Sequence, residues 1–261
     1  MRSNIPLIVS SCDKCSDLWQ PFFMMVKKYW TGFDKKVYLC TDSMTFEYDD
    51  IDIECPLRMP KNSTWSWNLM TLLEQIKDEY VLFMLDDFWL KSKVDVLRLN
   101  QYEEIIKEDP TVGFVCLVFQ LNSSVENPIS EKYDDLIEYG RDTLYRVTTQ
   151  AGLWRRDYLL SLLRKHESAW WFEMFGSKRS RKSRFVSYVV RDSVFSYDEG
   201  GVLLRGSYVS EYIKYFEDKG IIINPQRRIA SKGGLENEIK GNSFSQKLNP
   251  LFIYHYCLSH F

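Results

Sequence analysis

Six mostly apolar residues followed by two adjacent carboxylates limit the choice of fold more than any other segment of this chain. The run at 80–85, Tyr-Val-Leu-Phe-Met-Leu, leads directly into Asp86 and Asp87. A short, continuous apolar run is typical of a strand that is buried on both faces, as in a parallel sheet covered by helices. We therefore predict an α/β fold in which Asp86 and Asp87 lie at the carboxyl end of a central strand.

The position of this carboxylate pair also indicates a binding site. In open α/β sheets, ligands bind beyond the carboxyl ends of the strands. Two neighbouring carboxylates are costly there unless a metal ion, an arginine or sugar hydroxyls offset their charge. We expect Asp86 and Asp87 to handle a nucleotide diphosphate with a divalent cation. The Asp-Asp pairs at 49–50 and 134–135 lack a preceding buried strand, and we interpret them as surface loops.

Predicted strands and helices alternate along most of the chain, which favours a mostly parallel sheet flanked by helices. The remaining predicted strands are at 6–10, 36–41, 51–55, 112–119, 144–149 and 184–190. Helices are predicted at 18–30, 94–107, 156–165, 167–176 and 207–219, and a further helix is predicted from a cap at Asn62 or Ser63 to residue 76. Polar loops are predicted at 122–140 and 230–249. Because no repeat or low-complexity linker interrupts the chain, we expect one domain over residues 1–261.

The composition is that of an ordinary globular protein. The 261 residues are 45% hydrophobic and 27% charged, and the formal net charge of −2 gives no signal for a nucleic-acid partner. The first residues lack the pattern of a signal peptide, and no apolar stretch approaches the ~20 residues that cross a bilayer. We expect a cytoplasmic protein.

Several motifs of other enzyme classes are absent from the sequence. GxGxxG, GxxxxGK[S/T] and GxSxG do not occur, and the chain has only 3 histidines. These absences argue against a dinucleotide dehydrogenase, a P-loop NTPase and a Ser-His hydrolase. Cys12 and Cys15 form a CxxC pair, but no second pair follows, so we interpret the 6 cysteines as reduced and structural.

Polar residues at two further predicted elements are candidates for nucleotide contact. Ser11 and Asp13 follow the first predicted strand, where small polar side chains either receive a nucleobase or ribose or cap the next helix. Trp65 and Asn68 open the helix before the Asp86 strand. Their polar groups either face the same sheet edge or, for the tryptophan, belong to the core. Both interpretations stay open at this point.

Later segments contain candidate substrate contacts and a candidate base. Gln150 and Trp154 join a predicted strand to a helix, and both are candidates for sugar contact, with a core position as the alternative for Trp154. The segment 167–173, Glu-Ser-Ala-Trp-Trp-Phe-Glu, places Glu173 among aromatic residues. Such surroundings suit a carboxylate to general-base work, and the alternative is a surface glutamate.

A basic run follows at 177–184, where five of eight residues are cations, including Arg179 and Arg181. Such runs are usually solvated surfaces or flexible loops. Beside a carboxylate base, the run also suits the phosphates of a donor or of a lipid pyrophosphate acceptor. Contact with an anionic membrane surface is a third use of the same charges.

Taken together, these segments resemble the bacterial GT-A-type glycosyltransferases of surface-polysaccharide (capsule and O-antigen) gene clusters. The resemblance covers roughly residues 5–205 and rests on SSCDK, the Trp/Ser/Asn-led helix, EYVLFMLDDF, QAGLWRRDYLL and ESAWWFE. It implies a GT-A-like nucleotide-sandwich fold. A nucleotide-sugar-binding half would cover about 1–120, and an acceptor-side half about 121–261.

The resemblance also implies roles for individual residues. Asp87 matches the metal-binding end of the DxD-type motif of the family, with Mn²⁺ or Mg²⁺ as the metal. The motif here reads Leu-Asp-Asp-Phe, so strict metal dependence does not follow from it. Glu173 matches the base of inverting members. The nucleotide sugar is expected to contact Ser11, Asp13, Trp65, Asn68, Asp86 and Asp87. The substrate is expected to contact Gln150, Trp154, Trp170, Arg179 and Arg181.

The expected activity is therefore that of a hexosyltransferase-like enzyme of cell-surface polysaccharide biosynthesis. It would move a sugar, with inversion, from a nucleotide-sugar donor (UDP-sugar favoured) to a saccharide or polyprenyl-pyrophosphate-linked acceptor, with peripheral contact at the inner face of the membrane. One alternative is a metal-dependent phosphoesterase or nucleotidyltransferase that uses Asp86 and Asp87, although such sites usually need further ligands. Another is a non-catalytic carbohydrate- or nucleotide-binding module.

Overall fold

A mixed eight-stranded sheet forms the centre of residues 1–199, the first of two units into which the chain divides. The computed structural model describes residues 5–120, 128–198, 200–204, 207–209, 213, 217, 218 and 220. The strand order is β3-β2-β1-β4-β7-β5-β8-β6. The strands are β1 (Leu7–Ser10), β2 (Val37–Cys40), β3 (Ile53–Glu54), β4 (Tyr80–Leu85), β5 (Val112–Cys116), β6 (Leu136–Glu138), β7 (Gly152–Arg155) and β8 (Val186–Val190).

The directions of the strands decide which residues reach the same edge of the sheet. β1, β2, β3 and β4 run parallel to one another, whereas β7 runs antiparallel to both β4 and β5. β8 is parallel to β5, and β6 is antiparallel to β8. The carboxyl ends of β1, β2, β4 and β5 therefore share one edge with the amino end of β7. We call it the carboxyl edge.

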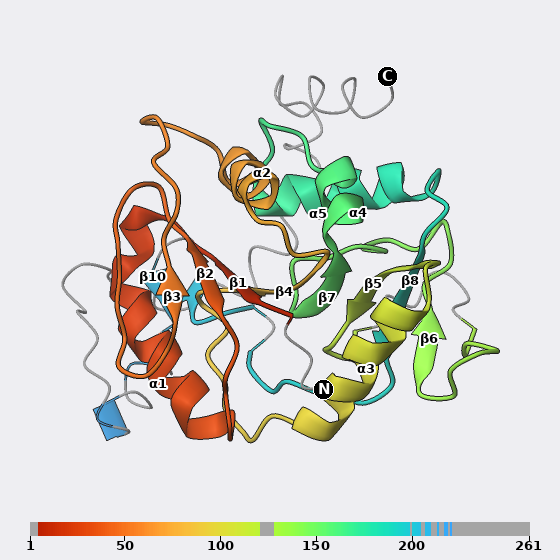
Figure 1. Ribbon diagram of the computed structural model, residues 1–261, viewed down its shortest axis with the longest axis horizontal. Helices are drawn as coiled ribbons and strands as arrows, with labels where there is room; N and C mark the ends of the chain where they lie inside the picture. Colours follow the sequence, from red (N-terminus) through yellow and green to blue (C-terminus); the bar gives the residue numbers. More distant parts are fainter. Residues whose placement is uncertain are drawn as a thin grey trace. The chain divides into compact units, whose positions relative to one another are not determined.

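Helices cover the sheet in two layers (Figure 1). α2 (Trp65–Gln75), α4 (Arg156–Leu162) and α5 (Ala169–Ser180) lie on one side, and α1 (Trp19–Tyr29) and α3 (Val96–Glu108) on the other. A short 3-10 helix, η1 (Asp13–Leu18), joins β1 to α1. The Thr64 and Ser168 hydroxyls cap α2 and α5 by accepting hydrogen bonds from backbone N–H groups of their first turns.

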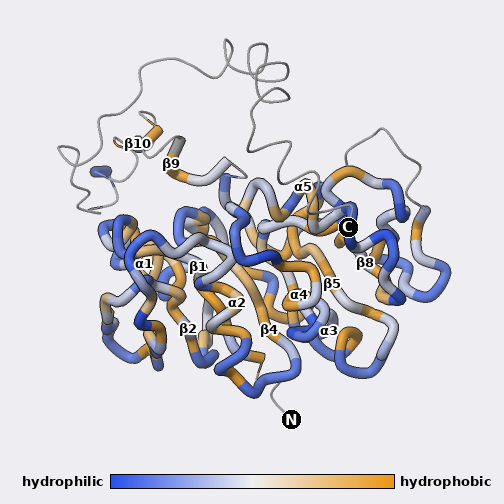
Figure 2. The backbone as a smooth tube through the Cα atoms, turned by 90° about the horizontal axis from the view of Figure 1, so that it is seen from above, coloured by the Kyte–Doolittle hydropathy of each residue, from blue (hydrophilic) through white to orange (hydrophobic). Residues whose placement is uncertain are grey.

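Alternate residues of the strands build the core beneath α2, α4 and α5. Val81, Phe83, Phe114 and Trp154 belong to this cluster, together with apolar residues of the three helices. Because side chains alternate between the two faces of a strand, Leu82 faces the opposite layer. Hydrophobic residues follow one another along β4 (Figure 2), and Val81 to Met84 are fully buried. The predicted central strand is therefore confirmed.

Two predictions around β7 are wrong. The segment predicted as a strand at 144–149 is irregular, and the strand that pairs with β4 is Gly152–Arg155. The reason is that side chains of α5 satisfy the backbone of this segment: the Ser177 hydroxyl accepts from the Val147 N–H at 3.1 Å and donates to its carbonyl at 3.0 Å. β6 lies within the segment predicted as a loop at 122–140. A strand of three residues is too short to give a recognisable pattern in the sequence.

The second unit is described over short stretches only. β9 (Leu203–Leu204) pairs antiparallel with β10 (Ser207–Tyr208). The helix predicted at 207–219 is therefore wrong at its start, and most of the rest of it, like the loop predicted at 230–249, lies outside the described residues. The division into a nucleotide-binding and an acceptor-side half stays a prediction. Among the described residues, no helix has the length and apolar character needed to cross a bilayer.

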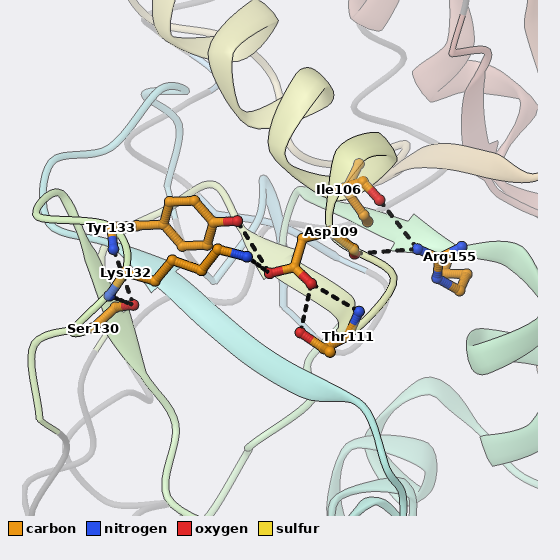
Figure 3. A network of polar contacts seen from close by, with 7 residues as sticks. All are labelled: Ile106, Asp109, Thr111, Ser130, Lys132, Tyr133 and Arg155. Atoms are coloured by element: carbon orange, nitrogen blue, oxygen red, sulfur yellow. Dashed lines mark hydrogen bonds and ion pairs between the residues drawn. The ribbon is translucent and has the colours of Figure 1, made fainter.

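A buried carboxylate organises the edge of the sheet opposite the carboxyl edge. Asp109 accepts hydrogen bonds from the Thr111 N–H and hydroxyl at 2.9 and 2.6 Å, from Lys132 Nζ at 2.8 Å and from the Tyr133 hydroxyl at 3.1 Å (Figure 3). Arg155 donates to two carbonyl oxygens at the end of α3, at 3.2 and 3.4 Å. The network joins α3, the start of β5 and the segment before β6.

Candidate active site

The ends of β1 and β4 are joined at the carboxyl edge by a partly buried hydrogen bond. The Ser11 hydroxyl donates to Asp86 Oδ2 at 2.5 Å and accepts from the Trp19 indole N–H at 2.6 Å. The Asp86 N–H donates to the Ser10 carbonyl at 3.2 Å. Asp86 is 7% exposed. Its position beside Ser11 brings together two residues that the sequence analysis names as expected nucleotide-sugar contacts.

Trp65 connects this pair to the helix layer. Its indole N–H donates to Ser10 Oγ at 2.8 Å, and its ring lies 6.4 Å from that of Phe83 and 5.6 Å from that of Phe172. The two interpretations of Trp65 are therefore both partly right. The ring packs on the apolar core, while the polar N–H reaches the carboxyl edge.

A second polar cluster ties β1 to β2. Asp13 Oδ1 accepts from the backbone N–H groups of Asp42, Ser43 and Met44 at 2.9–3.1 Å, and Oδ2 accepts from the Ser43 hydroxyl at 2.7 Å. In return, the Asp13 N–H donates to Asp42 Oδ2 at 3.0 Å. Burial alone would raise the pKa of the Asp13 carboxyl, but these hydrogen bonds hold it below its usual range. Asp13 thus anchors the loop after β2.

Asn68 completes this cluster from the first turn of α2. Its side-chain amide donates to Asp42 Oδ1 at 2.6 Å, and the residue is 3% exposed. Asp42 therefore receives hydrogen bonds from two residues that the sequence singled out, yet it is missing from the predicted site. The signal was present, because Asp42 directly follows the predicted strand at 36–41, as Ser11 and Asp86 follow theirs.

Glu173 is held at the same edge by the segment that precedes β7. Its Oε1 accepts from the Thr148 hydroxyl at 2.7 Å and from the Thr149 N–H and hydroxyl at 2.7 and 2.8 Å. Because β7 is antiparallel and pairs Gly152 with Phe83, the residues just before Gly152 lie beside the carboxyl end of β4. The sequence pattern predicts a strand over both threonines and therefore does not indicate their contact with Glu173.

Gln150 is connected to the turn that carries the carboxylate pair. The Tyr197 hydroxyl donates to Gln150 Oε1 at 3.0 Å and accepts from the Ala151 N–H at 2.8 Å. The Tyr197 ring stacks on Phe88, with centroids 4.5 Å apart and planes 8° from parallel. Phe88 directly follows Asp87, so the Gln150 and Asp87 segments are packed together. A single tyrosine in a polar segment gives no sequence signal, and Tyr197 is also missing from the predicted site.

Trp154, predicted to contact a sugar, belongs to the core. It is 1% exposed, and its ring stacks on Phe114 with centroids 4.0 Å apart. The Tyr158 and Phe172 rings lie 6.0 and 6.2 Å away. β7 places this side chain on the face covered by α4 and α5, which is the core position that the sequence left open as the alternative. The prediction for Trp154 is corrected accordingly.

The two predicted phosphate-binding arginines are engaged in ion pairs. Arg179 makes a bidentate pair with Glu167, at 2.8 and 2.6 Å, and the two side chains are 8% and 2% exposed. Arg179 Nε also donates to the Leu162 carbonyl at 2.8 Å. Arg179 therefore joins α4 to α5, and its expected role in substrate binding is corrected. Arg181 forms a more exposed pair with Asp142 at 3.3 Å.

An exposed aromatic residue lies beside Glu173. Trp170 is 41% exposed and precedes Glu173 by three residues on α5, so the two side chains share one face of the helix. Tyr145, whose φ is 57°, belongs to the same group. Burial raises the pKa of its hydroxyl, the negative charge of Glu173 raises it further, and a hydrogen bond with Trp170 acts in the opposite direction.

The carboxyl edge suits a cation that is bound together with phosphate. Within the described ranges, no group of three or more His, Cys, Asp or Glu side chains is arranged to hold a metal ion. Mg²⁺ sites commonly use one or two carboxylates and complete their coordination with water and substrate phosphates. Asp86 and Asp87 provide hard oxygen ligands of this kind, so the residues fit a metal that arrives with a diphosphate.

Comparisons with known proteins bear on the fold. No family model matches the sequence, and no curated protein matches it. The fold is similar to that of the mannosyltransferase PcManGT from Pyrobaculum calidifontis, solved in complex with GDP-Man and Mn²⁺. That alignment has a TM-score of 0.51 and 14% identity, and it covers 86% of this chain and 67% of PcManGT.

Two further solved structures are less similar. S. aureus TarS 1–349, in complex with UDP-GlcNAc, aligns with a TM-score of 0.49 and 14% identity over 84% of this chain and 65% of that chain. The bifunctional glycosyltransferase WbbM aligns with a TM-score of 0.40 and 8% identity over 69% of this chain and 37% of that chain. This chain thus spans less than two-thirds of TarS 1–349. The PcManGT alignment confirms the predicted GT-A-like α/β fold.

Proposed function

We propose that this protein is a glycosyltransferase that binds a nucleotide-sugar donor at the carboxyl edge. One observation carries the proposal: the Ser11–Asp86 pair and the Asp13–Asp42–Asn68 cluster meet at the edge to which α5 brings the candidate base. Carboxylates fixed in this way suit recognition of ribose hydroxyls and base N–H groups, because each oxygen has two acceptor sites. The GT-A-like fold supports this proposal.

In the proposed complex, Asp42 and Asp86 accept hydrogen bonds from the base and ribose, next to the indole of Trp65. Asp13 and Asn68 act through Asp42, which they hold in place at 3.0 and 2.6 Å. A UDP-sugar is the favoured donor. The diphosphate then lies towards Asp87, the half-buried member of the carboxylate pair.

Asp87 is the proposed ligand of Mn²⁺ or Mg²⁺. The cation would neutralise the charge that develops on the leaving diphosphate. The hydrogen bond from the Ser11 hydroxyl supports this division of roles, because it commits one oxygen of Asp86 to a protein donor. The complex of PcManGT with GDP-Man and Mn²⁺ makes such a metal plausible for this fold.

Glu173 is the proposed general base. Three hydrogen bonds from the threonines fix Oε1, so Oε2 is the oxygen proposed to take the proton of the acceptor hydroxyl. As that proton leaves, the acceptor oxygen forms a bond to the anomeric carbon, and the bond from this carbon to the diphosphate oxygen breaks. Attack from the face opposite the leaving group inverts the anomeric configuration.

The acceptor is proposed to lie against Trp170, with Gln150 and Arg181 as further contacts. An exposed indole offers an apolar face to a sugar ring, and Trp170 lies one turn before the proposed base. A saccharide or polyprenyl-pyrophosphate-linked saccharide is the proposed acceptor class. Cell-surface polysaccharide biosynthesis, a cytoplasmic location and peripheral contact of the basic run with an anionic membrane belong to the same proposal.

The test is product analysis with UDP-, GDP-, CMP- and dTDP-sugars, Mn²⁺ and candidate saccharide acceptors. The expected result is acceptor-dependent release of the nucleotide and a glycosylated product of inverted configuration. Glu173→Gln should lower kcat by about 10²–10⁴-fold with little change in donor Kd. Glu74→Gln is the matched control, because Glu74 is exposed near the far end of α2.

The two alternatives predict other outcomes of this assay. A phosphoesterase or nucleotidyltransferase releases phosphate or sugar, or joins a nucleotide to its substrate, without glycosylating an acceptor. A binding module retains a sugar or nucleotide but turns over none of the donors. Full activity of Glu173→Gln would contradict the assigned base and, with it, the inverting mechanism.

A further inference from the structure

Two thiols face each other at the start of η1. Cys12 Sγ and Cys15 Sγ are hydrogen bonded at 3.4 Å, and both residues are half-buried. A backbone hydrogen bond from the Cys15 N–H to the Cys12 carbonyl, at 2.8 Å, holds the two residues in a tight turn. Spatial pairing, rather than the CxxC spacing alone, makes them candidates for a disulfide.

The pair lies within the residues that build the proposed donor site. Cys12 stands between Ser11, which holds Asp86, and Asp13, which anchors the loop after β2. The hydrogen bond with Cys15 lowers the pKa of the Cys12 thiol, whereas burial and the negative charges of Asp86 and Asp42 raise it. The hydrogen bond with Cys15 nevertheless leaves the pKa of Cys12 below its ordinary value.

The other described cysteines have different surroundings. Cys40 and Cys116 are buried in strands β2 and β5, and burial raises the pKa of Cys40 far above its ordinary value. Cys55 is half-buried, and burial also raises its pKa. Thiols of this kind react slowly, because the thiolate is the reactive form. Cys55 therefore offers a matched control.

We propose that Cys12 and Cys15 form a reversible disulfide that switches off donor binding, a regulation that rests on the proposed function of the site. Intracellular disulfides are usually transient and redox-sensing rather than structural. The pair is close enough to react without a rearrangement of the fold. The pair also lies among the residues of the proposed donor site, so a disulfide there would alter nucleotide binding.

The reaction balances with a peroxide as oxidant. The Cys12 thiolate attacks a peroxide oxygen, the O–O bond breaks, and a sulfenic acid and hydroxide result. The Cys15 sulfur then attacks the Cys12 sulfur and expels the oxygen as water. For hydrogen peroxide, two thiols and one H₂O₂ give one disulfide and two waters. A dithiol reductant reverses the step by two thiol–disulfide exchanges and is itself oxidised.

Closing the bond changes the backbone around Asp13. The two sulfurs must approach from 3.4 Å to about 2.05 Å, and the short turn between them must absorb the movement. The same turn carries the Asp13 N–H that donates to Asp42 and the carboxylate that holds Ser43. We expect these contacts to weaken and the nucleotide site to lose its shape.

The experiment compares the full-length chain before and after stoichiometric H₂O₂. Thiol alkylation and peptide mass spectrometry map the disulfide, and calorimetry measures binding of UDP, GDP, CMP and dTDP, each with Mn²⁺. The expected result is a Cys12–Cys15 disulfide, at least a tenfold loss of affinity and full recovery with dithiothreitol. Cys15→Ser, or Cys15→Ala if that variant is unstable, should bind like the reduced protein and ignore peroxide. Cys55→Ser should respond like the wild type.

Several results would overturn the switch. They are the absence of a Cys12–Cys15 disulfide after oxidation, a mapped disulfide with unchanged nucleotide affinity, or a peroxide response that persists in both Cys15 variants. A reduced protein that binds none of the four nucleotides contradicts the proposed function as well, and the switch falls with it. Nucleotide binding that is equal in both redox states contradicts the switch alone.

Discussion

Ser11 Oγ lies 2.5 Å from Asp86 Oδ2 and donates a hydrogen bond to it, so the end of β1 holds the carboxylate that ends β4. The two residues are 75 positions apart in the sequence. Because β1 and β4 are adjacent and parallel, their carboxyl ends are fixed side by side by the backbone pairing. A nucleotide that contacts Asp86 therefore depends on Ser11.

Ser11→Ala should weaken nucleotide binding. The substitution removes a donor to a carboxylate that is largely buried, and hydrogen bonds to charged groups contribute about 1.5–3 kcal/mol. An affinity loss of about tenfold or more is expected in calorimetric titration. Ser161→Ala is the control, because the Ser161 hydroxyl bonds only within its own helix region, to the Tyr158 carbonyl at 2.7 Å. Equal affinity of the two variants would contradict the pairing described here.

Asp42→Asn should also weaken nucleotide binding, although sequence reasoning misses this residue. The amide replaces one of two oxygens that accept from Asp13 and Asn68, and it turns an acceptor into a donor at the proposed base and ribose contact. We expect at least a tenfold rise in nucleotide Kd. Asp157→Asn, at an exposed position on α4, controls for the loss of one charge. A Kd equal to that of this control would remove Asp42 from the site.

Two tryptophan variants should separate the core from the acceptor surface. Trp154→Ala should lower the free energy of unfolding by about 3–5 kcal/mol, because a fully buried ring is lost. Trp170→Ala should change it by at most about 0.5 kcal/mol and raise the acceptor KM instead. Chemical denaturation and acceptor titration check the two effects. A stable Trp154→Ala protein with a raised acceptor KM would restore the original sugar-contact prediction.

Acid should destabilise the protein partly through Asp109. Burial alone would raise the pKa of this carboxyl, but Lys132, Thr111 and Tyr133 together hold it well below its usual 3.8. A carboxyl whose pKa is lower in the folded state contributes stability that is complete above the unfolded pKa and is lost as the pH falls through the folded pKa.

Asp109→Asn should therefore cost about 2 kcal/mol at pH 7, and this difference should shrink as the pH falls below about 5. Denaturant unfolding of both proteins between pH 7 and pH 2 measures it. Stability curves that stay parallel over this range would contradict the assigned network. Since Asp109 lies at the opposite edge of the sheet, nucleotide affinity should stay unchanged.

Much of the fold follows from local patterns in the sequence. β4 is recognisable because a strand buried on both faces needs an uninterrupted apolar run, and the fully buried strands β1 and β2 follow the same logic. β6 and the true position of β7 do not follow from it. The 144–149 segment has strand-like residues, but its backbone bonds to Ser177, which is 30 residues away.

Residues of the candidate site can be predicted from the sequence where they directly follow a recognisable strand. Ser11, Asp13 and Asp86 are found in this way, and Asp42 obeys the same rule. Thr149 and Tyr197 are not found, because their roles arise from the antiparallel direction of β7 and from a ring stacked on Phe88. Trp154 and Arg179 show the converse: residue types common in sugar and phosphate sites are here used for packing.

The most direct test of the proposed donor site is calorimetric titration of the purified protein with UDP, GDP, CMP and dTDP, each with and without Mn²⁺. Asp87→Asn is the variant, and Asp157→Asn is its control. We predict tight binding of one nucleotide, strengthened by Mn²⁺, weakened in Asp87→Asn and unchanged in Asp157→Asn. No binding of any of the four, with or without metal, would contradict a nucleotide-sugar site and favour a carbohydrate-binding module.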